Sequence, residues 1–128
     1  MWGIFKIGSD RKIGDIYLAD GFGFHWFFNN PATVKIHYDV DLLAVKFTLN
    51  RLGFKTSIMD KSTADILSKL LDIEVPAELS VMILKPGDIL YIFRLGITLK
   101  KGQVLSKEEV LDLYKQGKAK FVMLEVLK

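Results

Sequence analysis

A chain of 128 residues has the length of a single domain, and it can bury enough surface to fold without disulfides or a structural metal. Hydrophobic residues make up 50% and charged residues 26%, which excludes a disordered chain. The absence of cysteine excludes thiol catalysis and cysteine-based zinc sites. The net charge of +3 permits an anionic partner but falls short of a dedicated nucleic-acid-binding surface.

No apolar stretch approaches the roughly 18 to 20 residues that cross a bilayer. The first residues, MWGIFKIGSD, also lack the charged start, apolar centre and cleavage site of a signal peptide. We therefore expect a soluble, cytoplasmic protein that does not bind membranes. Because His25 and His37 are the only histidines, an all-histidine metal centre is not expected, and we predict neither a metal site nor a cofactor.

The N-terminal third predicts strands. Two β-like runs, WGIFKIG and KIGDIYLA, flank the turn SDRK and predict a hairpin over residues 2–19. The next run, PATVKIHYDV, alternates like a half-buried strand, so we expect Val34, Ile36 and Tyr38 to face inward and His37 to face solvent.

Two helices are expected next. DVDLLAVKFTLNRLG predicts a helix with Asp39 as its N-cap and Gly53 just past its end. STADILSKLLD predicts another, opened by Ser62 with Asp65 three residues on, which is a variant of the capping box. Its apolar stripe consists of Ile66, Leu67, Leu70 and Leu71.

The stretch LSVMILKPGDILYIFRLGITL predicts an antiparallel hairpin, because Pro86 and Gly87 suit the central positions of a type II turn. Its strands are nearly all apolar, which predicts a central place in the sheet with helices over both faces.

The last stretch, SKEEVLDLYKQGKAKFVMLEVL, predicts a helix capped by Ser106, with Glu109 completing the capping box and Gly117 in the left-handed position at its end. The strand AKFVMLEVL follows. Together the elements predict an α/β fold in which a mixed β-sheet packs with about three helices, as one domain over residues 1–128.

The stretch between Arg94 and Lys107 has four basic residues and no acidic one: Arg94, Lys100, Lys101 and Lys107. It is either a solvated loop with strand ends or an edge that faces an anion, and both interpretations stay open.

The segment GQVLSKEEVLDLYKQGK, from Gly102 to Lys118, matches the pattern G-x-V-L-S-x-x-E-[IV]-x-x-[ML]-Y-x-x-G-K. With SIMDKSTADILSKLLDI, PGDILYIFRL and the first strand and loop, DIYLADGFGFHWF, the chain resembles the viral ring-nuclease anti-CRISPR family. This family comprises small proteins of archaeal viruses and phages, with cellular relatives. The resemblance covers about residues 15–125 and leaves residues 1–14 as an extension.

The resemblance implies a homodimer, in the host-cell cytoplasm if the gene is viral. It also implies that this dimer binds cyclic tetra-adenylate, the second messenger of type III CRISPR defence, in a shared pocket and cleaves it without a metal. In that family a ribose 2′-hydroxyl attacks the adjacent phosphate while a histidine protonates the departing 5′-oxygen. That role suits histidine because its pKa lies near the operating pH.

The chain departs from the family at the catalytic positions. The family's I-G-H-x-[SA]-T is IMDKST here, so Asp60 stands in place of the histidine. An aspartate is mostly ionised at pH 7 and repels a phosphate. The family's arginine and glutamate correspond to Thr98 and Lys101, and its loop asparagine and serine correspond to Asp20 and Gly23.

We therefore expect a divergent, catalytically impaired protein that binds cyclic oligoadenylate or a related nucleotide, and sequesters or senses it in type III CRISPR antagonism or regulation. The predicted ligand-binding residues are Asp20, Gly21, Phe22, Gly23, Lys61, Ser62, Thr63, Thr98 and Lys101. Two alternatives stay open. One is an active, metal-independent ring nuclease with His25 or Asp60 as the acid, and the other is a fold reused as a viral protein- or nucleic-acid-binding module.

The stretch DGFGFHWFF, residues 20–28, carries several competing interpretations. Gly21 and Gly23 would let backbone amides approach a phosphate, or they serve tight packing. His25 is either a replacement acid or a buried or dimer-facing side chain. The five aromatic residues stack adenines, fill the core or, in the preferred interpretation, form a subunit interface.

Overall fold

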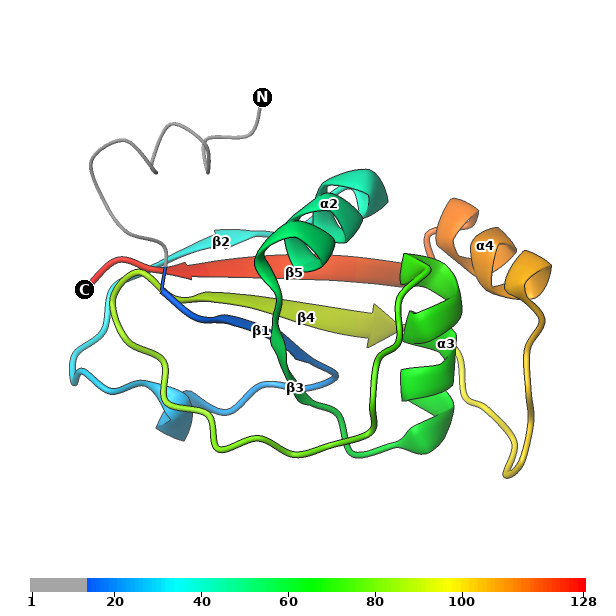
Figure 1. The fold of residues 1–128 in the computed structure, drawn as a ribbon, viewed down its shortest axis with the longest axis horizontal. Helices are drawn as coiled ribbons and strands as arrows, with labels where there is room; N and C mark the ends of the chain where they lie inside the picture. The colour runs from blue at the N-terminus through cyan, green and yellow to red at the C-terminus, as the bar shows by residue number, and fades with distance from the viewer. Residues whose placement is uncertain (1–13) are drawn as a thin grey trace.

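The computed structural model describes residues 14–128 and has a five-stranded sheet with three α-helices (Figure 1). The strands are β1 (Ile16–Ala19), β2 (Val34–His37), β3 (Lys55–Ser57), β4 (Ile89–Leu95) and β5 (Ala119–Val126). They stand in the order β2-β5-β4-β1-β3. Because β1 is parallel to β3 and β4 while β5 is antiparallel to β4 and β2, the sheet is mixed and the predicted fold class is confirmed.

The helices are α2 (Leu42–Leu52), α3 (Lys61–Leu71) and α4 (Lys107–Lys115), with a short 3-10 helix, η1 (Phe24–Trp26). α4 begins as predicted, with a complete capping box between Ser106 and Glu109. The caps of the other two helices were predicted wrongly. α2 is capped by Asp41 rather than Asp39, because the Asp41 carboxylate accepts a hydrogen bond from the Leu43 amide at 3.1 Å. α3 begins one residue before Ser62 and is capped by Asp60.

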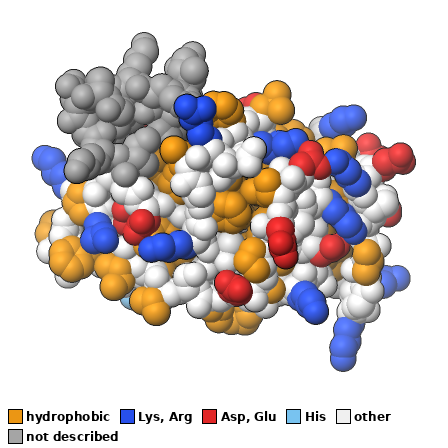
Figure 2. All heavy atoms as spheres, in the orientation of Figure 1, with side chains coloured by type: hydrophobic (Ala, Val, Ile, Leu, Met, Phe, Trp, Pro, Cys, Tyr) orange, Lys and Arg blue, Asp and Glu red, His pale blue; other side chains and the backbone are white. Residues whose placement is uncertain are grey.

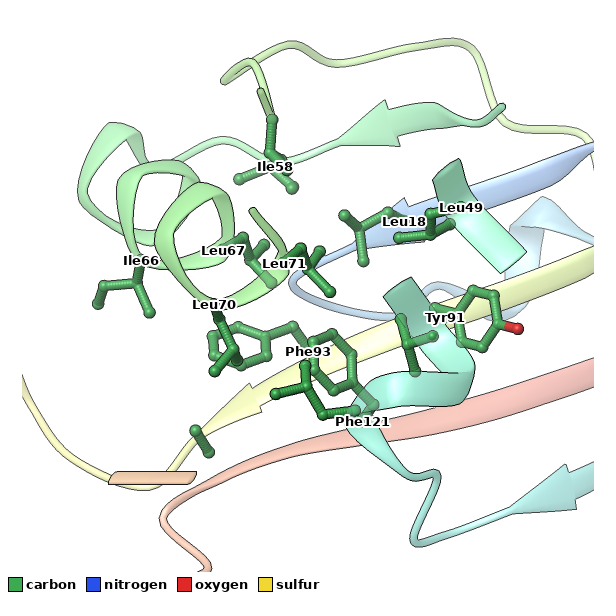
Figure 3. Packing of buried hydrophobic residues seen from close by; sticks show 14 of the residues in the cluster. Leu18, Leu49, Ile58, Ile66, Leu67, Leu70, Leu71, Tyr91, Phe93 and Phe121 are labelled. Atoms are coloured by element: carbon green, nitrogen blue, oxygen red, sulfur yellow. The ribbon is translucent and has the colours of Figure 1, made fainter. Parts of the chain in front are cut away.

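One face of the sheet packs against α2 and α3 and forms the larger core. Figure 3 shows Leu18, Tyr91, Phe93 and Phe121 of the sheet beneath the helices. The contacting helical residues shown there are Leu49 of α2 and Ile66, Leu67, Leu70 and Leu71 of α3. The predicted apolar stripe of α3 is therefore confirmed, and each of its members is at most 2% exposed.

The opposite face of the sheet, here called the helix-free face, has no α-helix of residues 14–128 over its buried cluster. Tyr17, Leu90 and Leu124 point to it and are covered by Met82 and Leu84, with Trp26 and Phe27 packed alongside. The covering residues come from the extended segment 79–84 and from the end of η1.

This arrangement overturns part of the predicted hairpin around Pro86 and Gly87. The turn itself forms, because the Asp88 amide donates to the Lys85 carbonyl at 3.0 Å and Gly87 has a φ of +95°. Segment 79–84 does not pair with β4, since β1 and β5 occupy both edges of that strand. β4 is central as predicted, but the α-helices of the described part of the chain pack on one of its faces and not on both.

β2 alternates as predicted, but the exposure of its two faces differs from the prediction. Ile36 on the helix-free face is 42% exposed, and Tyr38 just beyond the strand is 73% exposed. His37 instead is half-buried on the helix side, where its Nε2 lies 3.2 Å from Oε2 of Glu125. The cause is position, because β2 is an edge strand that pairs only with β5 and lies beyond the segment that covers the sheet centre.

The predicted N-terminal hairpin lies largely outside the described residues. Its second run does contain a strand, β1, but β3 and β4 occupy both edges of β1. Residues 16–19 therefore have no free edge for another strand. Between residues 14 and 128, no helix is both long and apolar enough to cross a membrane.

Candidate functional site

Three loops lie side by side at one end of the strands, because each follows the carboxyl end of a parallel strand. This end of the sheet is here called its carboxyl edge. The first follows β1 at Asp20, the second joins β3 to α3, and the third follows β4 at Gly96 (Figure 1). Open α/β sheets bind ligands at this edge. All the predicted ligand-binding residues lie on these loops or on the first turn of α3, so the fold brings to one edge segments that are far apart in the sequence.

Both carboxylate oxygens of Asp60 accept hydrogen bonds from the first turn of α3. One carboxylate oxygen accepts a hydrogen bond from the Ser62 amide at 3.1 Å, and the other accepts one from the Thr63 hydroxyl at 3.2 Å. A helix N-terminus favours anions because its first amides have no intrahelical partner. Here the chain supplies its own anion to that position, so a phosphate would have to compete with Asp60.

The third loop, which contains Thr98 and Lys101, is a tight exposed turn. The Gln103 amide donates to the Lys100 carbonyl at 2.9 Å, and the Lys100 amide donates to the Gln103 side chain at 2.9 Å. Gly102 has a φ of +76°, which favours glycine. The turn holds Lys100 and Lys101 in solvent, and neither has an ion-pair partner within the described part of the chain.

The two glycines of the first loop have different surroundings. A Cβ on Gly21 would meet nothing within 4 Å, so that backbone is open to close approach by a ligand. A Cβ on Gly23 would lie 2.6 Å from Cε1 of His25. Packing explains Gly23, whereas Gly21 fits the ligand interpretation.

His25 lies on η1 and is exposed, so it is not the buried side chain of one interpretation, and its place in a dimer interface stays a prediction. Its ring stands edge-on to Trp26, with centroids 5.9 Å apart. His25 does not line the large groove beside this loop. The two candidate acids, His25 and Asp60, therefore lie on separate elements, and Asp60 is already hydrogen-bonded within α3.

A groove of about 550 Å³ lies on the helix-free face, next to the first loop. Asp20, Gly21 and Phe22 line it from the loop, whereas Gly23, the start of α3 and the third loop do not. The aromatic side chains from this loop stand edge to face, with Phe22 5.1 Å from Phe24 and 5.8 Å from Phe27. The sheet supplies the remaining wall through Val34, Ile36, Tyr38, Ile92, Arg94, Val122 and Leu124.

The five aromatic residues of the loop take different places. Trp26 and Phe27 pack against the covered part of the sheet, whereas Phe24 is 83% and Phe28 67% exposed. Figure 2 shows hydrophobic side chains gathered at the lower left, where η1 and segment 79–84 lie. Within residues 14–128, Phe22, Phe24 and Phe27 line the groove and do not fill it.

Metal binding has no support within residues 14–128, where no group of three or more histidine, aspartate or glutamate side chains could hold an ion. Arg94 and Tyr38 line the groove but were not among the predicted site residues. The signal for Arg94 was the basic stretch that begins with it. The alternation of β2 was the signal for Tyr38, but it was interpreted as an inward-facing position.

Comparisons with known proteins agree with this architecture. The family model described as STIV B116-like matches residues 16–117 of the chain. Among solved structures, B116 of Sulfolobus turreted icosahedral virus (STIV) is similar, with a TM-score of 0.76 and 24% sequence identity over 88% of this chain and 99% of that chain. At this identity the likeness shows the fold alone. No curated protein matches the chain.

Proposed function

Because the chain belongs to the STIV B116-like family, whose name comes from a viral protein, we propose that it binds a nucleotide of the cyclic oligoadenylate class at the carboxyl edge of its parallel strands. The protein then sequesters or senses this ligand and does not cleave it efficiently. One observation carries the proposal: three loops expected to contact the ligand lie at the edge where open α/β sheets bind ligands.

The chemistry of this edge fits a ring of nucleotides. The apolar groove of about 550 Å³ is within the usual range for ligand sites, and Phe22 and Phe24 offer ring edges and faces to a base. Lys100 and Lys101 stand in solvent on the third loop, outside the groove but at the same end of the parallel strands, and attract phosphate groups. The open backbone at Gly21 allows close approach of a ligand.

The arrangement of the candidate acids argues against efficient cleavage. A general acid must reach the leaving oxygen and carry a proton to it. Both carboxylate oxygens of Asp60 are engaged by the Ser62 amide and the Thr63 hydroxyl, and His25 lies outside the groove. Asp60 stands at the position that the resemblance assigns to the catalytic histidine, but there it serves as the N-cap of α3.

Calorimetric titration tests the proposal with cyclic oligoadenylates of three to six nucleotides. We expect heat from one ring size, weaker binding for Lys101→Gln, and unchanged binding for Lys85→Gln. Lys85 is a matched control because it is exposed and precedes the amino end of β4. The proposal fails if no ring size produces heat. Release of linear product from cyclic tetra-adenylate would instead support the active-enzyme alternative.

A second candidate function, self-association, is favoured by the open apolar surface of the helix-free face. Phe24, Phe28 and Ile36 are exposed on or beside it, and none of the α-helices within residues 14–128 lies over that face. A second copy seated there would enclose the groove between two protomers. Sedimentation should show a dimer that Ile36→Lys dissociates and Leu43→Lys leaves intact. Leu43 is 70% exposed on α2, over the other face of the sheet. A monomeric wild-type protein would reject this candidate.

A further inference from the structure

Two cations stand directly opposite each other at the end of the central strand pair. In the antiparallel ladder of β4 and β5, Arg94 pairs with Lys120. Paired residues point to the same face with Cβ atoms roughly 4.5 to 5.5 Å apart, and like charges in such pairs destabilise the sheet. The two positive charges at this position therefore lower the stability of the sheet, and the fold does not require both residues to be basic.

More positive charge surrounds the pair. A hollow of about 390 Å³ beside it is lined by Arg94, Lys118 and Lys120, with Asp39 as its one carboxylate. Three cations against one carboxylate leave a formal surplus of two. Asp39 compensates weakly, because its Oδ1 lies 3.9 Å from Nζ of Lys120 and its side chain is 80% exposed. Within the described chain, Arg94 and Lys118 have no ion-pair partner.

The backbone holds these cations in place. The Gly96 amide donates to the Lys118 carbonyl at 2.6 Å, which ties the end of β4 to the start of β5. A Cβ on Gly96 would lie 3.3 Å from that carbonyl oxygen, so glycine permits the close approach. The positive charges are therefore gathered by the sheet register and not by a mobile tail.

An aromatic ring completes the hollow. Tyr38 is 73% exposed and lines both this hollow and the apolar groove, as do Arg94, Leu95 and Val122. The two depressions therefore adjoin each other, with Lys118 and Lys120 on one side, apolar side chains on the other, and Arg94 lining both. A ligand that carries both a phosphate and a planar ring fits a cationic hollow that lies beside an apolar groove.

We propose that Arg94, Lys118 and Lys120 form a phosphate-binding site, with Tyr38 positioned to stack on a ring attached to the phosphate. The ligand class is a phosphate ester with a planar group, such as a nucleoside diphosphate. A bound phosphate neutralises the opposed charges of Arg94 and Lys120, so ligand binding relieves the repulsion that the free protein carries.

The inference does not depend on the cyclic oligoadenylate proposal, because its first probe is inorganic tripolyphosphate. We expect tripolyphosphate to raise the melting temperature of the wild-type protein at low salt, and the rise to shrink as salt screens the exposed charges. Arg94→Gln and Lys120→Gln should each weaken binding roughly two- to fivefold. Asp39→Asn should strengthen it, and Lys85→Gln should leave it unchanged.

A second readout separates a binding site from a merely structural role. In phosphate-free, low-salt buffer, Arg94→Gln and Lys120→Gln should each raise the melting temperature, because each removes one charge of a repelling pair. Structural cations would lower it when removed. Adenosine diphosphate should bind more tightly than inorganic pyrophosphate, and Tyr38→Ala should abolish that difference without changing pyrophosphate binding.

Three results would overturn the proposal. The first is no stabilisation by tripolyphosphate at low salt. The second is stabilisation that Arg94→Gln and Lys85→Gln reduce equally, which would indicate diffuse charge. The third is equal binding of adenosine diphosphate and pyrophosphate, which would remove the role of Tyr38. The titration with cyclic oligoadenylates is a separate measurement, so failure of one proposal can be told from failure of the other.

Discussion

The Asp60 carboxylate accepts a hydrogen bond from the Ser62 amide at 3.1 Å and thereby closes the N-terminus of α3. The resemblance to ring nucleases assigns a proton donor to this position, and aspartate serves it as a helix cap. Compared with the histidine that the resemblance expects, Asp60 therefore lacks a proton to donate, adds a negative charge beside the proposed phosphate site and stabilises α3. Its effects on stability and on binding can be separated experimentally.

Asp60→Ala should lower the free energy of unfolding by about 1 kcal/mol, because alanine cannot accept the Ser62 hydrogen bond. Urea denaturation measures the loss. Asp65→Ala is the control, since it removes an exposed carboxylate from the same helix and breaks only the surface pair with Lys69, worth about 0.5 kcal/mol or less. Equal losses in the two variants would show that Asp60 does not act as a cap.

Asp60→Asn should keep most of the stability, because asparagine caps helices about as well as aspartate. It should also bind cyclic oligoadenylate more tightly than the wild-type protein, because the carboxylate charge is gone while the amide-rich helix start remains. Calorimetry at low salt compares the two proteins. Unchanged affinity would place the ligand phosphates away from α3.

Asp72 joins the three helices and should control stability in acid. It ends α3 with a φ of 55°, and its carboxylate accepts hydrogen bonds from Lys107 of α4 and from Lys46 of α2. These bonds lower the pKa of Asp72 from 3.8 to about 2. Because the pKa is lower in the folded state, the contribution is complete above the unfolded value and is lost as pH falls from near 4 toward 2.

In the Asp72→Asn variant, the free energy of unfolding should therefore depend less on pH in this acidic range. Asparagine tolerates the left-handed conformation but does not titrate. Urea denaturation from about pH 5 to about pH 2 measures this dependence. Asp112→Asn is the control, because Asp112 is exposed and has no ion pair within residues 14–128. If Asp72→Asn leaves the pH dependence of stability in acid unchanged, Asp72 does not control it.

Gly21→Ala should leave stability within about 0.5 kcal/mol of the wild-type value, because the added methyl group meets nothing within 4 Å. Gly53→Ala is an informative contrast. Its surroundings are equally open, but its φ of 75° and ψ of 169° suit only glycine, so the loss should be about 1 to 3 kcal/mol. Thermal unfolding separates them. If Gly21→Ala is stable yet weakens nucleotide binding, the ligand approaches this backbone closely.

Tyr114→Phe should cost about 1 kcal/mol, because the Tyr114 hydroxyl accepts a hydrogen bond from the Leu42 amide at 2.9 Å and thereby ties α4 to the start of α2. Tyr38→Phe removes a hydroxyl from a residue that is 73% exposed and should change stability little. Urea denaturation of both variants tests the difference. A neutral Tyr114→Phe would mean that water replaces the hydroxyl without loss.

The sequence was most informative where structure depends on near neighbours. The capping box of α4 involves residues three apart, and the Lys85–Asp88 turn needs only a proline and a glycine in the correct places. Both formed as predicted. The partner of segment 79–84 could not be predicted in this way, because that depends on which strands already occupy the edges of β4.

The candidate site shows the same division. Resemblance directed attention to the loop at Asp20, the start of α3 and the turn at Lys101, and the fold places all three at one sheet edge. Nothing in the local sequence indicated that Arg94 faces Lys120, because the two residues are 26 positions apart and their pairing depends on the register between β4 and β5.

By itself, the sequence determined the α/β class, the apolar stripe of α3, the capping box of α4 and the turn at Pro86 and Gly87, because these depend on residues a few positions apart. Only the tertiary structure decided which sheet face stayed without helices, whether the aromatics after Asp20 fill or line the groove, and which cations face each other. These features arise from strand order and register. A strand that is buried at the centre of a sheet and one that is exposed at its edge can carry the same alternating pattern.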